Sequence, residues 1–202
     1  MDPGEDSTVF YVLRHAETVW SREDRIQGQR DTGLTALGEE QAMKAGEACD
    51  LDFDLYHSSD LERAKETARL FQEGMDLDAD IELSEDLRER DFGVMQGEPS
   101  SAIDTGSIES LDPEEGESWD EIYERAAGYI EEVADSAPGQ QVAVFTHKGV
   151  IQALLAELAP DMTGGEAYRE DIGYLSGVVL EAQSEPRVYD EGDYCVDMLE
   201  DV

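Results

Sequence analysis

Apolar and polar residues alternate in blocks along this chain, and the blocks predict strands and helices in turn. Residues 8–13 (TVFYVL) are β-branched and aromatic and follow a polar start, so they predict a buried strand. A second strong run, within QQVAVFTHKG at residues 140–149, is typical of a central parallel strand covered on both faces. Shorter runs complete the predicted strands, at residues 53–57, 81–87, 175–182 and 187–189.

Helical spacing of apolar residues predicts four helices between these strands. Their expected limits are Thr35 to residue 48, Ser59 or Asp60 to Gly74, Ser118 to residue 134, and residues 150–158 before Pro160. The first of them should bury one apolar face, made of Leu34, Leu37, Ala42, Ala45 and Ala48. The third should bury another, made of Trp119, Ile122, Tyr123, Ala126, Ile130 and Val133.

This order of elements predicts an α/β fold, with a mostly parallel central sheet in a three-layer α/β/α arrangement. The length of 202 residues suits a single domain over residues 1–202. Residues 93–118 are irregular and rich in Gly, Pro, Ser and Asp, so we expect a surface lid or loop insertion there. The acidic C-terminus beyond the last strand is expected to be mobile.

Acidic residues dominate the composition and limit the classes of partner. The chain has 51 Asp and Glu against 14 Lys and Arg, which gives a formal net charge of −37. Such a surface repels nucleic acid and anionic membranes, so neither is an expected partner. The acids are spread along nearly every segment, a pattern typical of halophilic proteins, in which molar salt screens charges over ~3 Å. The alternative is an acidic protein that binds a basic partner, although such proteins tend to concentrate charge in blocks.

The rest of the composition favours a cytoplasmic protein, and the high charge favours a monomer or homodimer only when salt is present. Cys49 and Cys195 are too few and too far apart for a disulfide framework. Apolar stretches fall short of the ~20 residues that a membrane helix needs, and we expect no targeting segment.

Three predicted strands are followed by polar or basic side chains, namely Arg14 and His15, Ser58 and Ser59, and His147 and Lys148. Ligands of open α/β sheets bind outside the carboxyl ends of the strands, where these side chains should meet. Two of the chain's three histidines are placed in the same way. With Arg63 they would form a local positive pocket in a negative field, and a phosphoryl group is the small anion that suits such a pocket.

Five ordered motifs give the chain a resemblance to a known family. The opening stretch LRHAETVWSREDRIQGQRDTGLTALGEEQA is followed by SSDLERAKETA, LRERDFGVMQGE, GESW and FTHKGVI. Together they resemble the motifs of the histidine phosphatase superfamily, the phosphoglycerate mutase-like proteins, over roughly residues 8–155. The pattern is most similar to that of the short phosphatase members.

The resemblance implies roles for individual residues. His15 would be the nucleophile that is transiently phosphorylated. Glu89 would be the general acid that protonates the leaving oxygen and then the base that activates water. The residues implied to bind substrate are Arg14, Ser21, Gln27, Gly28, Arg63 and His147. Because arginines and histidines would supply the positive charge, neither a metal nor a cofactor is expected.

Two positions depart from the family's usual pattern. Ala16 replaces the glycine after the histidine, and alanine would be strained there if the backbone needed a positive φ. Ser21 replaces an asparagine that usually touches the phosphate, so a hydrogen-bond donor is kept with a shorter reach.

The acid motif leaves a choice among carboxylates. Glu85, Asp86 and Asp91 lie within a few positions of Glu89 and are alternative candidates for the acid. Arg88 and Arg90 are expected to be surface partners of these acids. They are not expected to be ligands of the substrate.

Three classes of function fit these observations. Hydrolysis of a small phosphomonoester, a small phosphorylated metabolite, through a phosphohistidine is the favoured one, because the interval between the acid motif and the second histidine is short. Mutases of the family usually carry a longer insertion there, so a phosphoglycerate mutase is the alternative. A non-catalytic phosphate-binding protein is a third possibility, which the presence of every core position disfavours.

Overall fold

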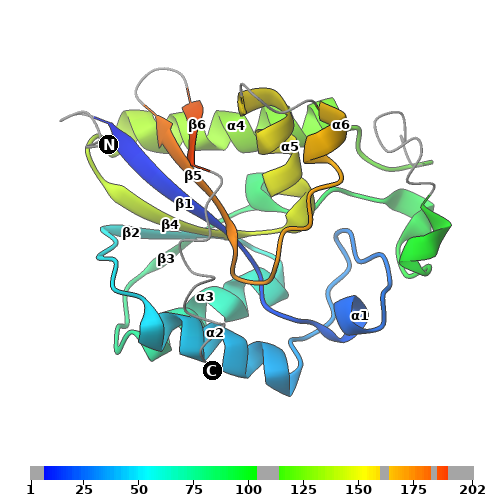
Figure 1. Cartoon of the computed structure of the whole chain (residues 1–202), viewed down its shortest axis with the longest axis horizontal. Coiled ribbons are helices and arrows are strands. Elements are labelled where there is room, and N and C mark those ends of the chain that lie inside the picture. Colours follow the sequence, from blue (N-terminus) through cyan, green and yellow to red (C-terminus); the bar gives the residue numbers. More distant parts are fainter. Residues whose placement is uncertain (1–6, 104–113, 160–163, 183–185, 191–202) are drawn as a thin grey trace.

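The central sheet of the computed structural model has six strands in the order β3-β2-β4-β1-β5-β6 (Figure 1). The structure describes residues 7–103, 114–159, 164–182 and 186–190. β1 to β4 run parallel, whereas β5 pairs antiparallel with both β1 and β6. The strands are β1 (Thr8–Arg14), β2 (Leu55–Ser59), β3 (Ile81–Ser84), β4 (Gln141–Thr146), β5 (Gly177–Ala182) and β6 (Pro186–Asp190).

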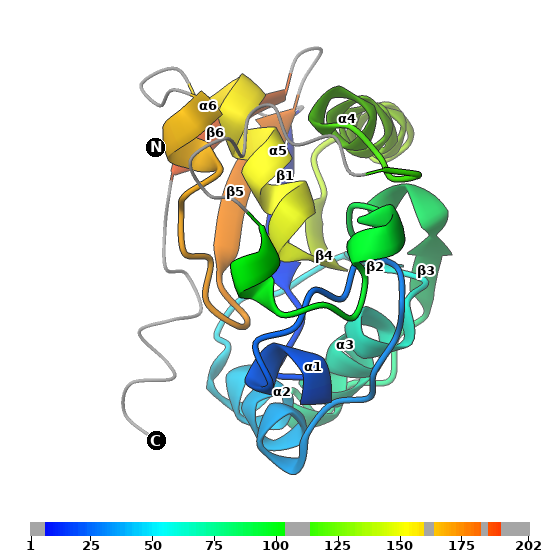
Figure 2. The same ribbon diagram turned by 90° about the vertical axis from the view of Figure 1, so that its right-hand side faces the viewer.

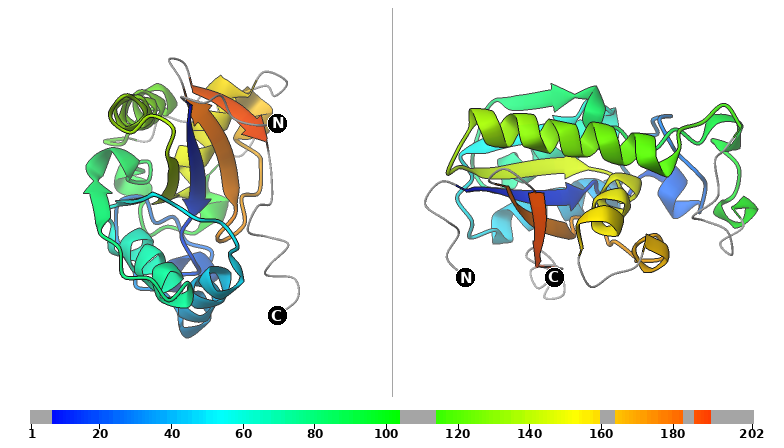
Figure 3. Two further views of the ribbon diagram at one scale, coloured as in Figure 1. Left: turned by 90° about the vertical axis from the view of Figure 1, so that its left-hand side faces the viewer. Right: turned by 90° about the horizontal axis from the view of Figure 1, so that it is seen from above.

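Helices cover both faces of the sheet, so the predicted α/β/α fold is confirmed. Helices α4 and α5 lie on one face and α2 and α3 on the other, and the right view of Figure 3 shows α4 running along the strands. The helices are α1 (Val19–Arg22), α2 (Ala36–Ala48), α3 (Glu62–Gly74), α4 (Trp119–Ser136), α5 (Lys148–Leu158) and α6 (Gly164–Ala167). Short 3₁₀ turns occur at Glu85–Leu87, Gly93–Met95 and Ser100–Ala102.

The alternation of side chains along the strands gives the sheet a separate apolar core on each face. Phe10 and Val12 point to the face that α4 and α5 cover, where they pack with Ile122 and Leu154. Leu13 and Phe145 belong to the other core, which α2 and α3 complete with small side chains and Phe71. The strands are therefore held from both sides, and their carboxyl ends are fixed in position.

The strand and helix limits differ from the predicted ones where a tertiary contact decides them. β2 begins at Leu55 and includes Ser58 and Ser59, which are buried within the strand and do not follow it. α3 begins at Glu62, and its first amide is capped by Asp31, whose Oδ2 accepts from Glu62 N at 2.7 Å. The predicted cap at Ser59 or Asp60 is wrong because a loop about thirty residues earlier supplies the cap.

The buried face of α2 agrees with the expected one at Ala42 and Ala45 and differs from it elsewhere. Leu37 is 52% exposed, and the residues that this helix buries are Gly38, Ala42, Ala45 and Gly46. Small residues allow the backbones of α2 and α3 to approach closely. The buried face of α2 is therefore set by this close approach more than by large apolar side chains. The buried face of α4 was predicted correctly apart from the half-buried Tyr123, and the Ser118 capping box begins that helix.

The described part of the predicted lid lies against the segment that follows β1. Ile26 N donates to Glu98 O at 2.9 Å, Gly97 N donates to Ile26 O at 2.8 Å, and Ser100 N donates to Asp24 O at 2.8 Å. Figure 2 shows the side of the molecule on which these two segments and α1 lie. Residues 104–113 of the predicted lid and the C-terminal residues 191–202 lie outside the described residues, so the lid stays a prediction.

Among the described helices, none combines the length and the apolar character needed to cross a membrane.

Close backbone contact between α2 and α3 generates a prediction about stability. A Cβ added at Gly46 would overlap the carbonyl oxygen of Phe71, whereas one added at Gly128, on the exposed side of α4, would meet open space. We expect Gly46→Ala to lower the free energy of unfolding by about 1–3 kcal/mol. Gly128→Ala should raise it by about 0.5–1 kcal/mol, because alanine is the better helix former. Denaturant titrations in molar KCl measure both, and equal effects of the two substitutions would contradict the packing argument.

Candidate active site

The parallel pairing of β1 with β4 brings His15 and His147 together. Arg14 is in register with Thr146, so the next residue of each strand lies beside the other. His15 N donates to Thr146 O at 2.9 Å, and the two imidazole centroids lie 5.2 Å apart. Both histidines are buried. The same sequence position after two adjacent strands thus yields a histidine pair at the sheet edge.

Two arginines flank the histidine pair. Arg63, in the first turn of α3, is almost completely buried, and its guanidinium donates to Asp31 Oδ1 at 2.9 Å and to Gly28 O at 2.7 Å. Arg14 ends β1 and donates to Ile172 O at 2.5 Å, and its guanidinium lies 4.5 Å from the ring centre of Tyr174. These contacts use part of each guanidinium and hold it in one orientation.

The buried edge is rich in nitrogen atoms that the protein itself does not satisfy. Among the described residues, buried polar side-chain atoms without a partner are Arg14 Nε, Arg63 Nε, both ring nitrogens of His147, and Gln72 Nε2. Four of these five belong to the histidine and arginine group. A buried donor without an acceptor costs about 1–3 kcal/mol, so their concentration in one place is typical of a site that binds an anion.

The protonation state of His15 favours a nucleophilic role. Burial, followed by the charges of Arg63 and Arg14, lowers the pKa of His15 well below its usual value, so the ring is neutral at neutral pH. Its Nδ1 lies 2.7 Å from the carbonyl oxygen of Ala16. Because a carbonyl can only accept, the single ring proton sits on Nδ1, which leaves the lone pair on Nε2. Burial and the same arginines also lower the pKa of His147.

Glu89 lies close to this group on a loop that β4 and α5 anchor. Thr146 Oγ1, at the end of β4, donates to Leu87 O at 2.7 Å and fixes the start of the loop. The Glu89 carboxylate accepts from Arg90 N at 2.9 Å and from Gly149 N, in the first turn of α5, at 3.1 Å. Its charge opposes the effect of burial on the pKa of both Arg14 and Arg63, so the carboxylate faces the cationic centre.

An ion pair at the start of α4 holds the Glu89 loop from behind. Arg125 forms a bidentate pair with Glu117, at 2.6 and 2.9 Å, and both side chains are mostly buried. The same guanidinium donates to Asp86 O at 2.6 Å and to Glu89 O at 3.3 Å. Glu117 and Arg125 therefore act as positioning residues for the carboxylate of Glu89.

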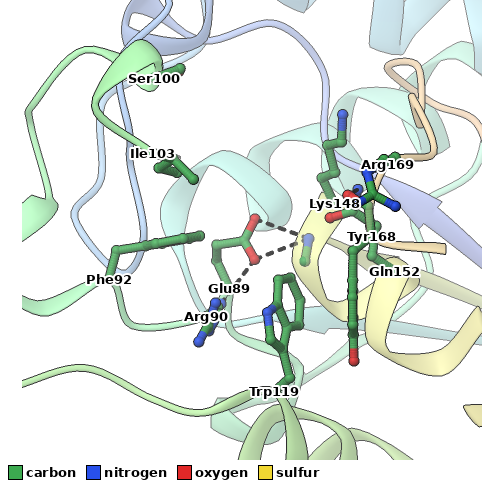
Figure 4. Close-up of a pocket in the computed structure, with 11 residues that line it drawn as sticks. Glu89, Arg90, Phe92, Ser100, Ile103, Trp119, Lys148, Gln152, Tyr168 and Arg169 are labelled. Carbon is green, nitrogen blue, oxygen red and sulfur yellow. Dashed lines mark hydrogen bonds between the residues drawn. The ribbon is translucent and has the colours of Figure 1, made fainter. Parts of the chain in front are cut away.

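A pocket of about 520 Å³ opens beside Glu89 (Figure 4). Its walls include Phe92, Ile103 and Trp119, which are apolar, and Lys148 and Arg169, which are cationic. The size falls within the range of ~300–1,000 Å³ that is usual for small-molecule sites. Glu89 lines this pocket and its charge also acts on Arg14 and Arg63, so this residue links the pocket to the cationic centre.

In the part of the chain that the structure describes, no group of three or more His, Cys, Asp or Glu side chains is arranged to hold an ion.

A family model described as the histidine phosphatase superfamily (branch 1) matches residues 10–191. The chain belongs to the histidine phosphatase superfamily. It is therefore an enzyme of that superfamily, and the resemblance of its five motifs is confirmed.

Individual members of the superfamily are similar over most of their length. Phosphoglycerate mutase-like protein 4 of Arabidopsis thaliana is 33% identical, over 77% of this chain and 73% of that protein. The metal-independent phosphoserine phosphatase of Arabidopsis thaliana is 31% identical, over 83% of this chain and 76% of that protein. The solved structure of mycobacterial glucosyl-3-phosphoglycerate phosphatase has a TM-score of 0.77 and 29% identity, and covers 91% of this chain and 96% of that one.

The three other predicted substrate-binding residues frame this superfamily site through contacts within the protein. Thr18 Oγ1 donates to Gln27 Oε1 at 2.9 Å and lies 3.1 Å from Ser21 Oγ, and Ser21 completes the capping box of α1. Gly28 has a positive φ of 54° and presents its carbonyl to Arg63. Their contact with substrate stays a prediction, whereas their hydrogen bonds shape the loop that holds Arg63.

The departure at Ala16 proves to be free of backbone strain. Among the described non-glycine residues, positive φ occurs at Asp24, Asp76, Glu115 and Leu175, so Ala16 has an ordinary φ. Its methyl group is buried, and its amide donates to Thr67 Oγ1 at 3.1 Å. Alanine is therefore compatible with the backbone conformation and the packing at this position.

The expectation for the two arginines beside Glu89 is half wrong. Arg88 is a surface partner, but of Asp60, at 2.7 and 2.5 Å, as well as of Glu85. Arg90 is completely buried, and its guanidinium lies 4.3 Å from the ring centre of Trp119. Its burial could not be predicted because the covering residues come from α4, about thirty positions later in the sequence.

Most of the site residues that the sequence analysis did not identify hold another residue of the site in position. Asp31 fixes Arg63 and caps α3, and the only sign of it was its place in the opening motif. Glu117 had a similar sign in GESW. Tyr168 and Arg169 line the pocket but follow no motif, so nothing in the sequence pointed to them.

Protonation of His15 and His147 should destabilise the protein in acid. The unfolded chain keeps a histidine pKa near 6.5, whereas the folded-state pKa values of His15 and His147 lie well below it. The unfolded state thus binds more protons below pH 6.5, and the free energy of unfolding should fall there by about 1.4 kcal/mol per pH unit for each histidine. Denaturant titrations at a series of pH values on both sides of this value measure the slope.

The matched control for this slope is the double variant His15→Asn/His147→Asn. Asparagine carries no titratable proton, so the variant should lose stability more slowly than the wild type as the pH falls. Parallel pH profiles would mean that the folded protein already accepts these protons.

Proposed function

We propose that the protein hydrolyses a small phosphomonoester through a phosphohistidine formed on His15. The observation that carries this proposal is the convergence of a neutral buried imidazole with unsatisfied guanidinium and imidazole nitrogens at one sheet edge. The group has the charge and the donors that a phosphoryl group needs. The amides of Arg90 and Gly149 hold the Glu89 carboxyl group beside it, where its acid form would supply the proton that a leaving alkoxide needs.

The first step transfers the phosphoryl group to the protein. The Nε2 lone pair of His15 attacks phosphorus, and the bond from phosphorus to the ester oxygen breaks. Glu89 in its acid form donates a proton to the departing oxygen. Arg14, Arg63 and His147 stabilise the negative charge of the phosphoryl oxygens through the transition state. The Ala16 carbonyl steadies the His15 ring as positive charge develops on it.

The second step returns the enzyme to its starting state. The Glu89 carboxylate takes a proton from water, and the resulting oxygen nucleophile attacks phosphorus. The bond between phosphorus and Nε2 breaks, inorganic phosphate leaves, and His15 is neutral again. Glu89 is also protonated again, ready for the next ester.

The names of two similar proteins and the openness of the pocket support hydrolysis over isomerisation. Two of the relatives described above carry names that specify phosphatases, for phosphoserine and for glucosyl-3-phosphoglycerate. Isomerisation would need the product to stay bound while the phosphohistidine is protected from water. The pocket beside Glu89 is partly open, which supports access of water to the intermediate.

Removal of the His15 imidazole tests the proposed nucleophile. We expect His15→Ala to release phosphate from a phenyl phosphate at least about a thousandfold more slowly than wild type, in molar KCl, because the covalent route is lost. The matched control is His57→Gln, which changes the third histidine, on the far side of β4, where it contacts Tyr129. Release by His15→Ala at the wild-type rate would rule out the mechanism. Turnover of 3-phosphoglycerate to its 2-isomer without free phosphate would instead identify a mutase.

The leaving group decides whether Glu89 is the acid. Glu89→Gln should slow the hydrolysis of alkyl phosphates about a hundredfold or more, because their alkoxides need a proton. Nitrophenyl phosphate, whose leaving group needs none, should be affected much less. Glu85→Gln is the control, since Glu85 is another acid of the motif and its side chain is 76% exposed. Equal losses on both classes of substrate would remove Glu89 from the acid role.

A further inference from the structure

The charge of the pocket beside Glu89 is opposite to that of the whole chain. Of the eleven described residues that line it, Glu89 is the one acid, whereas three are basic. The complete chain has 51 acidic against 14 basic residues, so a random piece of its surface would be strongly negative. A wall that reverses this ratio is suited to an anion in addition to the phosphoryl group.

Lys148 is one cation that a ligand could reach. It begins α5, directly before the glycine whose amide binds Glu89, and its side chain is 34% exposed. Its ammonium lies 3.0 Å from Asp171, whose side chain is 95% exposed. An ion pair this exposed contributes about 0–1 kcal/mol, so a bound anion can take the place of Asp171 at little cost.

Arg169 is held at the same pocket by the residues on either side of it. The amide nitrogen of Gln152, on α5, donates to the carbonyls of Tyr168 and Glu170, each at 3.0 Å. Tyr168 also stacks on Trp119, with ring centres 4.2 Å apart and planes inclined by 27°. The backbone around Arg169 is thus tied to both α5 and α4. Its exposed side chain is mounted on a fixed support.

The opposite part of the pocket is apolar. Figure 4 shows Phe92 and Ile103 across the pocket from Lys148 and Tyr168, with Trp119 below them. Arg90 is completely buried against Trp119 and donates to Glu117 O, so it supports the wall. If each non-hydrogen atom is given the ~30 Å³ that a water occupies in the liquid, a hydroxy acid of seven such atoms fills roughly 210 Å³. The pocket, at about 520 Å³, is larger than this.

We propose that the leaving group is an amphipathic organic acid. Its apolar or ring-containing body would lie on Phe92, Ile103 and Trp119, and a second anionic group, a carboxylate or a phosphate, would bind Lys148 and Arg169. This inference rests on the proposed function, because it assigns the pocket to the alcohol part of the phosphomonoester. It identifies the substrate class as an anionic phosphomonoester larger than a three-carbon acid.

A set of phenyl phosphates tests the second anion. The compounds carry a carboxylate, a second phosphate or a methyl ester at the meta or para position, and the methyl ester is the uncharged reference. For each, kcat/KM for phosphate release is measured in molar KCl, where contacts at hydrogen-bond distance survive screening over ~3 Å. We expect the wild type to prefer an anionic compound to the ester by about tenfold or more. The carboxylate and phosphate arms distinguish the two sources of charge.

Substitutions test whether Lys148 and Arg169 bind the second anionic group. In Lys148→Met/Arg169→Gln, the preference for the anionic compound should fall about tenfold, and the ratio to the ester cancels any common loss of activity. Lys44→Met removes a cation from an exposed pair on α2 and should leave the preference unchanged. A wild-type preference below twofold, or one that the double variant retains, would overturn the proposal.

A binding measurement separates this proposal from the proposed function. The same compounds are titrated calorimetrically into His15→Ala, which does not need to turn them over. Tighter binding of the anionic compound, lost in the triple variant with Lys148→Met and Arg169→Gln, supports the charged subsite even if hydrolysis is absent. If the wild type hydrolyses every compound and His15→Ala binds the anionic compound and the ester equally, the charged subsite is wrong and the phosphatase reaction is still supported.

Discussion

The parallel register of β1 and β4 is the constraint on which the site depends. Arg14 opposite Thr146 makes His15 and His147 neighbours, and the His15 amide continues the ladder by binding the Thr146 carbonyl. A slip by one residue would turn every side chain of β1 to the other face and exchange the two apolar cores. The cores therefore fix the register, and the register fixes the distance between the imidazoles.

The same edge concentrates positive charge in a protein that otherwise carries little of it. Burial lowers the pKa of the guanidinium groups of Arg14 and Arg63 and of both imidazoles. Desolvation of four basic groups is unfavourable, and the protein offsets only part of it, through Asp31 and backbone carbonyls. A phosphoryl group can accept from the remaining donors. Its binding would therefore offset the desolvation cost of those donors, which contacts within the protein do not offset.

Elements whose signals are local could be predicted from the sequence, and elements set by distant contacts could not. β1 and β4 are continuous apolar runs, and α4 begins with its own capping box, so all three were located closely. The start of α3 depends on Asp31 in a distant loop, and the buried face of α2 depends on close contact with α3. Likewise the motifs pointed to His15, Arg63, Glu89 and His147, whereas Tyr168 and Arg169 reach the pocket through tertiary packing alone.

The net charge of −37 also constrains how an anionic ester can reach this site. At low ionic strength the Debye length is ~30 Å, so the field of the whole surface opposes the approach of a phosphate ester. In molar salt the length falls to ~3 Å, and the distant acids no longer act on the ligand. Contacts at hydrogen-bond distance, such as those that Arg63 and Glu89 make, are affected far less. Salt thus removes the repulsive part of the potential while the buried cationic centre keeps its attraction, so short-range contacts at the sheet edge, and not long-range steering, must provide the affinity.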